Sequence, residues 1–250
     1  MAKPFKDYER PPITEAVIAL NFKSSIGFED LTSVSKKYLK DYPQTASVSN
    51  VHLAVDMSSS GNEGPVSTSM NQQNGLRLSS NDMTEIMVLW PQSFAISQLA
   101  PYVGWETFLN RFIRDWKRYK RHIGQKEISR IGVRYINRID IPVANDIVEH
   151  EKYLNVFPKL PASFTPLTAF AVQTALKIPD IGCDLLLNSA AAPSPVLDHA
   201  SFMLDLDIYK SIDLPQSDQQ IINLLNSIRQ KKNQIFEQCI SNRARKLFRK

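Results

Sequence analysis

Two aspartates in a strand-like stretch have the residue type and spacing closest to catalytic chemistry. Asp205 and Asp207 alternate with apolar residues between Phe202 and Tyr209. A strand would place both carboxylates on one face, roughly 7 Å apart. Carboxylate pairs hold metal ions or serve proton transfer in hydrolases and nucleases. The alternative, which we favour, is that both aspartates pair with arginines on a neighbouring strand.

Such arginines occur in the stretch 130–138. In a strand, Ile131, Val133 and Tyr135 would share one face. The opposite face would carry Arg130, Arg134 and Arg138. Clustered guanidinium groups require carboxylates, phosphates or solvent to offset their repulsion. We therefore expect a structural ion-pair lattice of these arginines with Asp205 and Asp207. An anion site for phosphate is the alternative.

Basic side chains gather in two blocks of the chain. Residues 101–140 carry ten basic and four acidic side chains, and residues 216–250 carry eight and two. Basic surfaces of this kind bind the phosphates of nucleic acids. The candidate anion or nucleic-acid contacts are Arg111, Arg114, Lys117, Arg118, Arg121, Arg245 and Lys246. A solvated helix face is the alternative, since no known nucleic-acid-binding motif accompanies them.

Other kinds of chemistry lack their sequence patterns. None of the four histidines has a second His or Cys at metal-ligand spacing, and Cys-x-x-Cys, His-Glu-x-x-His and Gly-x-Ser-x-Gly are absent. With eight glycines, the chain has no glycine-rich phosphate cradle. We predict no catalytic residue, metal or cofactor, and hence a protein that is not an enzyme. Cys183 and Cys239 lie among apolar residues and are expected to be buried thiols.

Composition and periodicity predict an α+β fold. Hydrophobic residues make up 43% of 250 residues, enough for a folded core. Strands are expected at 13–22, 48–57, 76–80, 84–90, 127–142, 167–178, 182–189 and 201–211. Helices are expected at 28–42, 105–122 and 218–248, and loops at 58–74, 91–104 and 190–195. No signal peptide or apolar run of about 18 residues occurs, so we expect a cytoplasmic protein without a membrane partner.

The order of these elements suggests two similar halves. Residues 1–124 and 125–250 each run approximately β-α-β-β-β-α, with a helix closing each half. We expect antiparallel sheets with the helices packed on one face. The halves would form two domains or one continuous domain.

Three stretches together resemble a known bacterial family. They are Pro11–Val17, Leu99–Trp105 and Arg130–Pro142. In combination they are similar to the TIGR04255 family, whose members have about this length. The resemblance brings no established activity, cofactor or catalytic residue. The family's scattered occurrence is similar to that of accessory genes in mobile or defence-related loci.

Two functions are therefore expected. The first is a non-enzymatic binding or regulatory role through a protein partner, based on the missing catalytic patterns and the polar loop at 58–74. The second is binding of a nucleic acid or a phosphate-bearing ligand through the basic surfaces. The sequence does not specify the oligomeric state.

Overall fold

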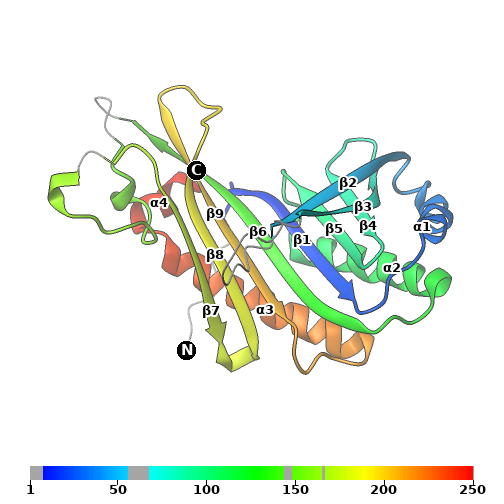
Figure 1. The fold of residues 1–250 in the computed structure, drawn as a ribbon. Coiled ribbons are helices and arrows are strands. Elements are labelled where there is room, and N and C mark those ends of the chain that lie inside the picture. The colour runs from blue at the N-terminus through cyan, green and yellow to red at the C-terminus, as the bar shows by residue number, and fades with distance from the viewer. Residues whose placement is uncertain (1–7, 56–67, 144–147, 165–166, 250) are drawn as a thin grey trace, which may run out of the picture.

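The computed structural model describes residues 8–55, 68–143, 148–164 and 167–249. Within these ranges, nine antiparallel strands form one sheet in the order β2-β3-β4-β5-β1-β6-β9-β8-β7 (Figure 1). The strands are β1 (Ile13–Phe22), β2 (Gln44–Val55), β3 (Thr68–Ser79), β4 (Glu85–Trp90), β5 (Ser93–Leu99), β6 (Ile128–Pro142), β7 (Ala171–Ile178), β8 (Cys183–Ala192) and β9 (His199–Lys210). The helices are α1 (Phe28–Ser35), α2 (Trp105–Ile123), α3 (Asp218–Cys239) and α4 (Asn242–Leu247).

The helices α2 and α3 lie on one face of this sheet, behind it in Figure 1. The predicted α+β fold, with helices packed on an antiparallel sheet, is confirmed. In the part of the chain that the structure describes, no helix combines the length and apolar character needed to cross a membrane.

The chain follows a similar path on each side of the sheet centre. From β1 it passes through α1 to the outer strand β2, returns through β3, β4 and β5 to the side of β1, and continues into α2. From β6 it reaches the outer strand β7, returns through β8 and β9 to the side of β6, and continues into α3. β1 and β6 pair antiparallel, from Ile13 opposite Asn137 to Phe22 opposite Ile128. Residues on both sides of position 124 therefore share one sheet.

The first half contains a strand that the sequence did not indicate. β5 occupies Ser93–Leu99, so the expected loop at 91–104 is wrong over these residues. Two residues, Pro91 and Gln92, connect β4 to β5. The strand resembled a loop because it carries Ser97 and Gln98, yet both are buried, 6% and 0% exposed. The second half was expected to have a helix after its first strand, as the first half does. Between β6 and β7, the described residues instead form short 3₁₀ turns at His150–Lys152 and Ala162–Phe164.

The expected loop at 58–74 and strand at 76–80 also need correction. Residues 58–67 lie outside the described ranges. Residues 68–74 belong to β3, which pairs with β2 from Val55 opposite Thr68 to Gln44 opposite Ser79. Backbone hydrogen bonds of an outer hairpin do not require apolar side chains, which is why a polar sequence forms these strands. Similarly, Ala190–Ala192, expected in a loop, extend β8.

The final helix is shorter than expected. α3 ends at Cys239, and Ile240 is extended, with φ −121° and ψ 151°. Ile240 forms an isolated β-bridge with Leu154, and Ser241 then caps α4 by accepting from the N–H groups of Arg243 and Ala244. The break buries Ile240, which is 1% exposed. The first helix is also shorter than 28–42, since a 3₁₀ turn at Lys36–Tyr38 follows α1.

The core between sheet and helices is aromatic. The spacing of the apolar residues of α2 directs Phe112, Trp116 and Tyr119 towards the sheet. The ring of Tyr119 lies 5.7 Å from that of Phe22 on β1 and 5.1 Å from that of Phe94 on β5. These contacts fix α2 beneath the first half of the sheet.

Candidate functional site

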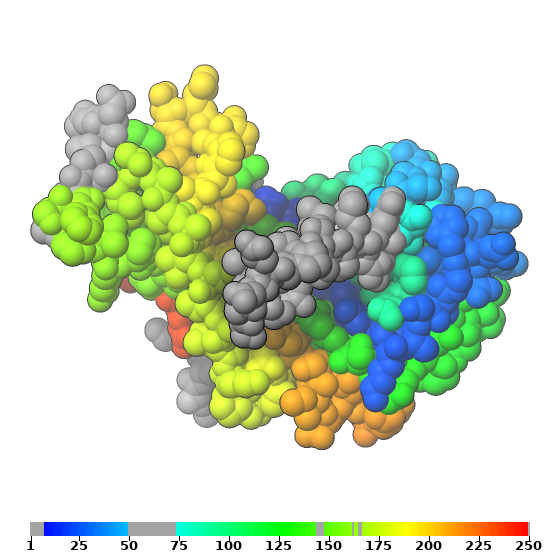
Figure 2. All heavy atoms as spheres, viewed as in Figure 1, coloured from blue at the N-terminus to red at the C-terminus, as the bar shows by residue number. Residues whose placement is uncertain are grey.

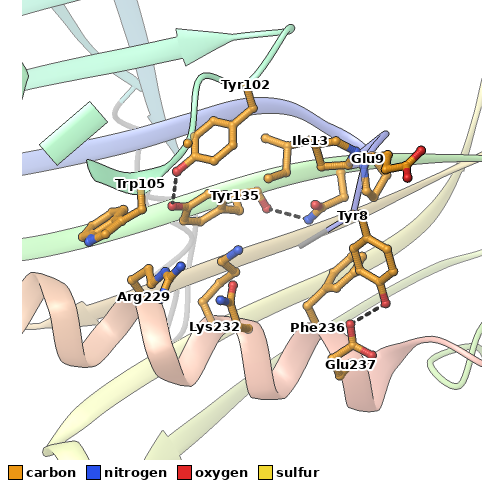
Figure 3. A pocket seen from close by; sticks show the side chains of 15 residues that line it. Tyr8, Glu9, Ile13, Tyr102, Trp105, Tyr135, Arg229, Lys232, Phe236 and Glu237 are labelled. Carbon is orange, nitrogen blue, oxygen red and sulfur yellow. Dashed lines mark hydrogen bonds between the residues drawn. The ribbon is translucent and has the colours of Figure 1, made fainter. Parts of the chain in front are cut away.

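A cavity of about 300 Å³ lies between the helix-covered face of the sheet and α3 (Figure 3). Its sheet wall comes from Tyr135 and Asn137 of β6. Its helix wall comes from Arg229, Lys232 and Phe236 of α3. The segment 8–13, hereafter the N-terminal strap, and the segment 102–105 complete it.

The three stretches that carried the family resemblance meet at this cavity. Pro11–Val17 contributes Ile13, Leu99–Trp105 contributes Tyr102, and Arg130–Pro142 contributes Tyr135. One stretch lies near the N-terminus and the other two in the middle of the chain. Pairing of β1 with β6 brings the first and third together. Gly104, with φ of 90°, allows the chain to turn from Tyr102 into α2.

Two tyrosine hydroxyls lie on the sheet side of the cavity. The Oη atoms of Tyr102 and Tyr135 are 3.0 Å apart, and their rings meet edge to face at 5.8 Å. Burial raises the pKa of Tyr102 to about 12, and burial raises that of Tyr135 as well. Both hydroxyls therefore remain neutral near pH 7; one donates to the other, and the second keeps a proton to donate. Asn137 Nδ2 donates to Leu204 O at 2.9 Å, which fixes the amide beside them.

A buried lysine on α3 faces the tyrosines. Lys232 is 7% exposed, and its Nζ lies 3.8 Å from the ring centroid of Tyr135. No ion pair or hydrogen bond joins Nζ to any residue within the described ranges. Burial, and secondly the charge of Arg229, lower the pKa of Lys232 to about 7. The amine is therefore divided between its charged and neutral forms at physiological pH.

The N-terminal strap closes one side of the cavity. Tyr8 Oη donates to Glu237 Oε1 at 2.5 Å, and the ring of Tyr8 lies 5.3 Å from that of Phe248. Arg10 N donates to Phe248 O at 3.2 Å. Arg245 Nε donates to Glu237 Oε2 at 2.6 Å, so this carboxylate is already engaged by two partners. The strap is held by contacts to α3 and to the residues after it.

The arginines of β6 lie on the opposite, open face of the sheet. Arg130 Nη2 donates to Asp207 at 2.7 Å, and Arg134 donates to both carboxylate oxygens of Asp205 at 2.9 and 2.7 Å. In the β6–β9 register, Asp207 lies opposite Arg134, and Asp205 lies opposite Ile136. Both ion pairs therefore run diagonally between the strands. Arg138 instead pairs with Asp140 on its own strand, at 3.1 Å.

Local packing explains how Arg130 reaches Asp207. The guanidinium group stacks on Tyr209, 4.2 Å from the ring centroid, and passes over Gly132. A Cβ at position 132 would lie 2.7 Å from Arg130 Nη1, so glycine leaves the necessary space. Burial raises the pKa of Asp207, and the neighbouring Arg130 and Arg134 partly oppose this effect. The two aspartates are engaged as ion-pair acceptors.

Figure 2 looks onto this face of the sheet, opposite α2 and α3. Asn188 of β8 also donates to Asp205, at 3.2 Å, so that carboxylate has partners on both neighbouring strands. Across the described part of the chain, no group of three or more His, Cys, Asp or Glu side chains is placed to hold a metal ion. Cys183 and Cys239 are buried thiols, and burial raises the pKa of each to about 11.

Several expected anion contacts on α2 are engaged within the protein. Arg111, expected on the surface, is 6% exposed and donates to Ser97 O at 2.7 Å. Its expected role as a surface contact is therefore wrong, because its guanidinium group donates hydrogen bonds to buried acceptors on β5. Arg114 pairs with Asp115 and Asp41, and Arg118 pairs with Asp41 at 2.6 Å.

The two basic blocks do not converge on one surface. Lys117 and Arg121 are exposed on α2, near the start of α3, where Lys120 pairs with Asp218. Arg245 and Lys246 lie on α4, beyond the other end of α3 (Figure 1). A helix of 22 residues separates them by about 33 Å. This arrangement does not favour a single nucleic-acid surface.

The cavity residues on α3 were missed from the sequence, although one signal was present. The buried positions of α3 are Ile221, Leu225, Ile228, Lys232, Phe236 and Cys239. Lys232 thus occupies the apolar stripe at regular helical spacing. A lysine at such a position must either extend its amine to solvent or enter the core.

The cavity is lined by aromatic rings, by the cations Arg229 and Lys232 on α3, and by the carboxylates of Glu9 and Glu237 on its strap side. Because Glu237 is already engaged by Tyr8 and Arg245, the α3 wall is suited to a small ligand with a negative charge. Arg229 supplies a permanent charge, and Lys232 a titratable one. No protein-family model matches this chain, and a search of curated proteins finds no similar sequence.

Proposed function

We propose that the protein binds a small oxyanion, a carboxylate or a phosphate ester with an aromatic or apolar body, in the cavity between α3 and β6. The observation that supports this most directly is the side chain of Lys232, which is 7% exposed and lines the cavity beside Arg229 without a carboxylate partner among the described residues. A buried cation without a counter-charge destabilises a fold. An oxyanion would offset that cost, and the volume of about 300 Å³ suits a small molecule.

This proposal narrows the phosphate-ligand alternative drawn from the sequence. The proposed ligand site moves from the exposed basic blocks to the cavity between α3 and β6. The aromatic side chains of Tyr102, Trp105 and Phe236 would contact the body of the ligand, and Arg229 its charge. The proposed role remains that of a binding protein.

Replacing Arg229 with glutamine is expected to weaken binding of an aromatic oxyanion such as phenyl phosphate or benzoate. Loss of a charge-assisted hydrogen bond costs about 1.5–3 kcal/mol, which corresponds to roughly ten- to hundredfold in Kd. Titration calorimetry at fixed ionic strength measures this effect. Lys246→Gln is the matched control, since it removes one exposed positive charge from α4. Equal affinities of the two variants, or no binding by the unmodified protein at millimolar ligand, would contradict the proposal.

The affinity should also fall as the pH rises through about 7. A bound anion favours the ammonium form of Lys232, whose pKa is about 7 in the free protein. Below this pH the amine is already charged, and above it binding must take up a proton. The other charged groups of the cavity wall are the guanidinium group of Arg229 and the carboxylates of Glu9 and Glu237.

We also propose a protein partner that adds a strand to β7. Among the described strands, β7 lies at the edge of the sheet and pairs with β8 alone. Leu176 is 51% exposed on it, and an edge strand offers unpaired backbone groups to an extended segment.

Leu176→Lys is expected to abolish copurification of such a partner from the native host. The control is Leu160→Lys, at a residue 47% exposed outside the strands. Affinity purification followed by mass spectrometry compares the two variants. The partner should be retained with Leu160→Lys, and recovery of the unmodified protein alone as a monomer would refute this second proposal.

A further inference from the structure

The amine of Lys232 has the surroundings of a nucleophile. It lies within a cavity, packed against the Tyr135 ring at 3.8 Å, and Arg229 stands one helical turn before it. Residues at i and i+3 on a helix are neighbours, so the two cations face the same space. Figure 3 shows both side chains directed from α3 towards the sheet.

The acidic groups nearest this space are occupied or exposed. Glu237 accepts from Tyr8 and Arg245, and Glu9 lies exposed on the N-terminal strap. Neither forms an ion pair with Lys232 in the described part of the structure. A buried amine with a cationic neighbour and no carboxylate favours its neutral form, which holds the lone pair needed for attack on a carbonyl. The pKa of about 7 agrees with this.

We propose that Lys232 forms an imine with a small oxo acid, a ligand whose aldehyde or ketone lies a few bonds from an oxyanion held by Arg229. This inference rests on the proposed oxyanion site and adds the reactive group of its ligand. Lys232 supplies the nucleophile and Arg229 orients the carbonyl carbon towards it. The hydrogen-bonded hydroxyls of Tyr102 and Tyr135 line the same cavity and offer one further proton for donation.

The step is balanced without any further reactant. The Nζ lone pair forms a bond to the carbonyl carbon while the C=O π electrons move to oxygen. A proton passes from nitrogen to that oxygen and gives a carbinolamine. Loss of the hydroxyl group and the second nitrogen proton as water leaves the C=N double bond. Nothing is oxidised or reduced, and hydrolysis reverses the step.

Reductive trapping tests this inference. The full chain is incubated with glyoxylate or pyruvate and cyanoborohydride, which reduces an imine to a stable secondary amine. Peptide mapping by mass spectrometry should place the adduct on Lys232 about tenfold or more above any other lysine near pH 7.5, because exposed lysines are almost wholly protonated there. Labelling of Lys232 should level off above about pH 8, whereas that of exposed lysines continues to rise.

Lys231 provides the internal control. It neighbours Lys232 in sequence but pairs with Asp180 at 2.5 Å on the surface. Lys232→Met should abolish the selective adduct, and Lys231→Met should leave it unchanged. Equal labelling of Lys231 and Lys232 would overturn the inference.

Lactate separates the two proposals, since it carries the carboxylate of pyruvate without the carbonyl. If lactate binds in competition with phenyl phosphate but pyruvate gives no selective adduct, the imine proposal is refuted and the oxyanion-site proposal stands. Absence of binding by phenyl phosphate, benzoate, lactate and pyruvate refutes both.

Discussion

Replacing Asp115 with alanine is expected to lower the free energy of unfolding by about 3–5 kcal/mol, the cost of leaving a buried charge network without one member. Asp115 is 0% exposed. It accepts from Tyr42 Oη at 2.6 Å and from Arg114 Nε at 2.8 Å. Tyr42 Oη also accepts from Arg111 Nη1 at 3.3 Å, so the hydroxyl links the carboxylate to the buried guanidinium group. Without Asp115, this network loses its central acceptor.

Urea denaturation of the full chain measures the loss. Asp41→Ala is the matched control, because Asp41 also binds Arg114 and Arg118 but has a side chain 23% exposed. It should cost no more than about 1 kcal/mol, as do most solvent-accessible ion pairs. Similar losses in the two variants would show that Asp115 acts as a surface charge.

Replacing Lys232 with methionine is expected to stabilise the protein, in contrast to most changes in a core. Methionine keeps the length and apolar stem of the side chain but removes an amine whose burial is costly. We expect a gain of about 2–3 kcal/mol at pH 7, after allowing for the lost contact of the ammonium with the Tyr135 ring. The same substitution should remove the pH dependence of oxyanion binding.

The pH dependence of stability provides a second measurement. Folding lowers the pKa of Lys232 from 10.5 to about 7, so the unfolded chain binds more protons between these values. Stability of the unmodified protein, relative to Lys232→Met, should therefore rise by about 2 kcal/mol from pH 7 to pH 9. The raised pKa of Cys183 and Cys239 acts in the opposite direction, but equally in both proteins. A constant difference between the two proteins across this range would contradict the assignment.

Periodicity was sufficient to predict the elements with strong apolar patterns. The stripe Phe112, Trp116 and Tyr119 specified α2 almost to its ends, because its aromatic residues recur at helical spacing on one side. The alternation in 130–138 likewise separated Arg130 and Arg134 from Tyr135. These features depend on neighbours in sequence, which a single chain displays directly.

Burial of polar side chains was not predictable in the same way. Arg111 lies beside Arg114 on α2, and nothing local distinguishes the buried residue from the exposed one. The acceptors that retain Arg111 in the core, Ser97 and Gln98, belong to a strand that itself resembled a loop. The predictions of a surface Arg111 and of a loop at 91–104 were therefore wrong for the same reason. Arg111 and the acceptors on β5 can be buried only because they form hydrogen bonds with each other.

The cavity could not be predicted from neighbouring residues in the sequence, for a related reason. Tyr8, Tyr102, Tyr135 and Lys232 come from four segments that only the sheet topology brings together. A lysine within the apolar stripe of α3 was the one visible sign. Its meaning depends on which side chains stand opposite, and these are separated from it by about a hundred residues or more.

The hydrogen bond between Tyr8 and Glu237 spans 229 positions of the chain. Contacts that close so long a loop form late in folding, after the strands and helices that carry them are in place. Besides this bond and the rings of Phe236 and Phe248, the N-terminal strap is held before β1 by two backbone hydrogen bonds, Arg10 N to Phe248 O and Arg138 N to Pro12 O. These contacts are separate from the sheet ladder, so the strap should open without unfolding of the sheet. The strap thus provides a route by which a ligand can enter and leave while the rest of the fold persists, and amide hydrogen exchange there would report the occupancy of the cavity.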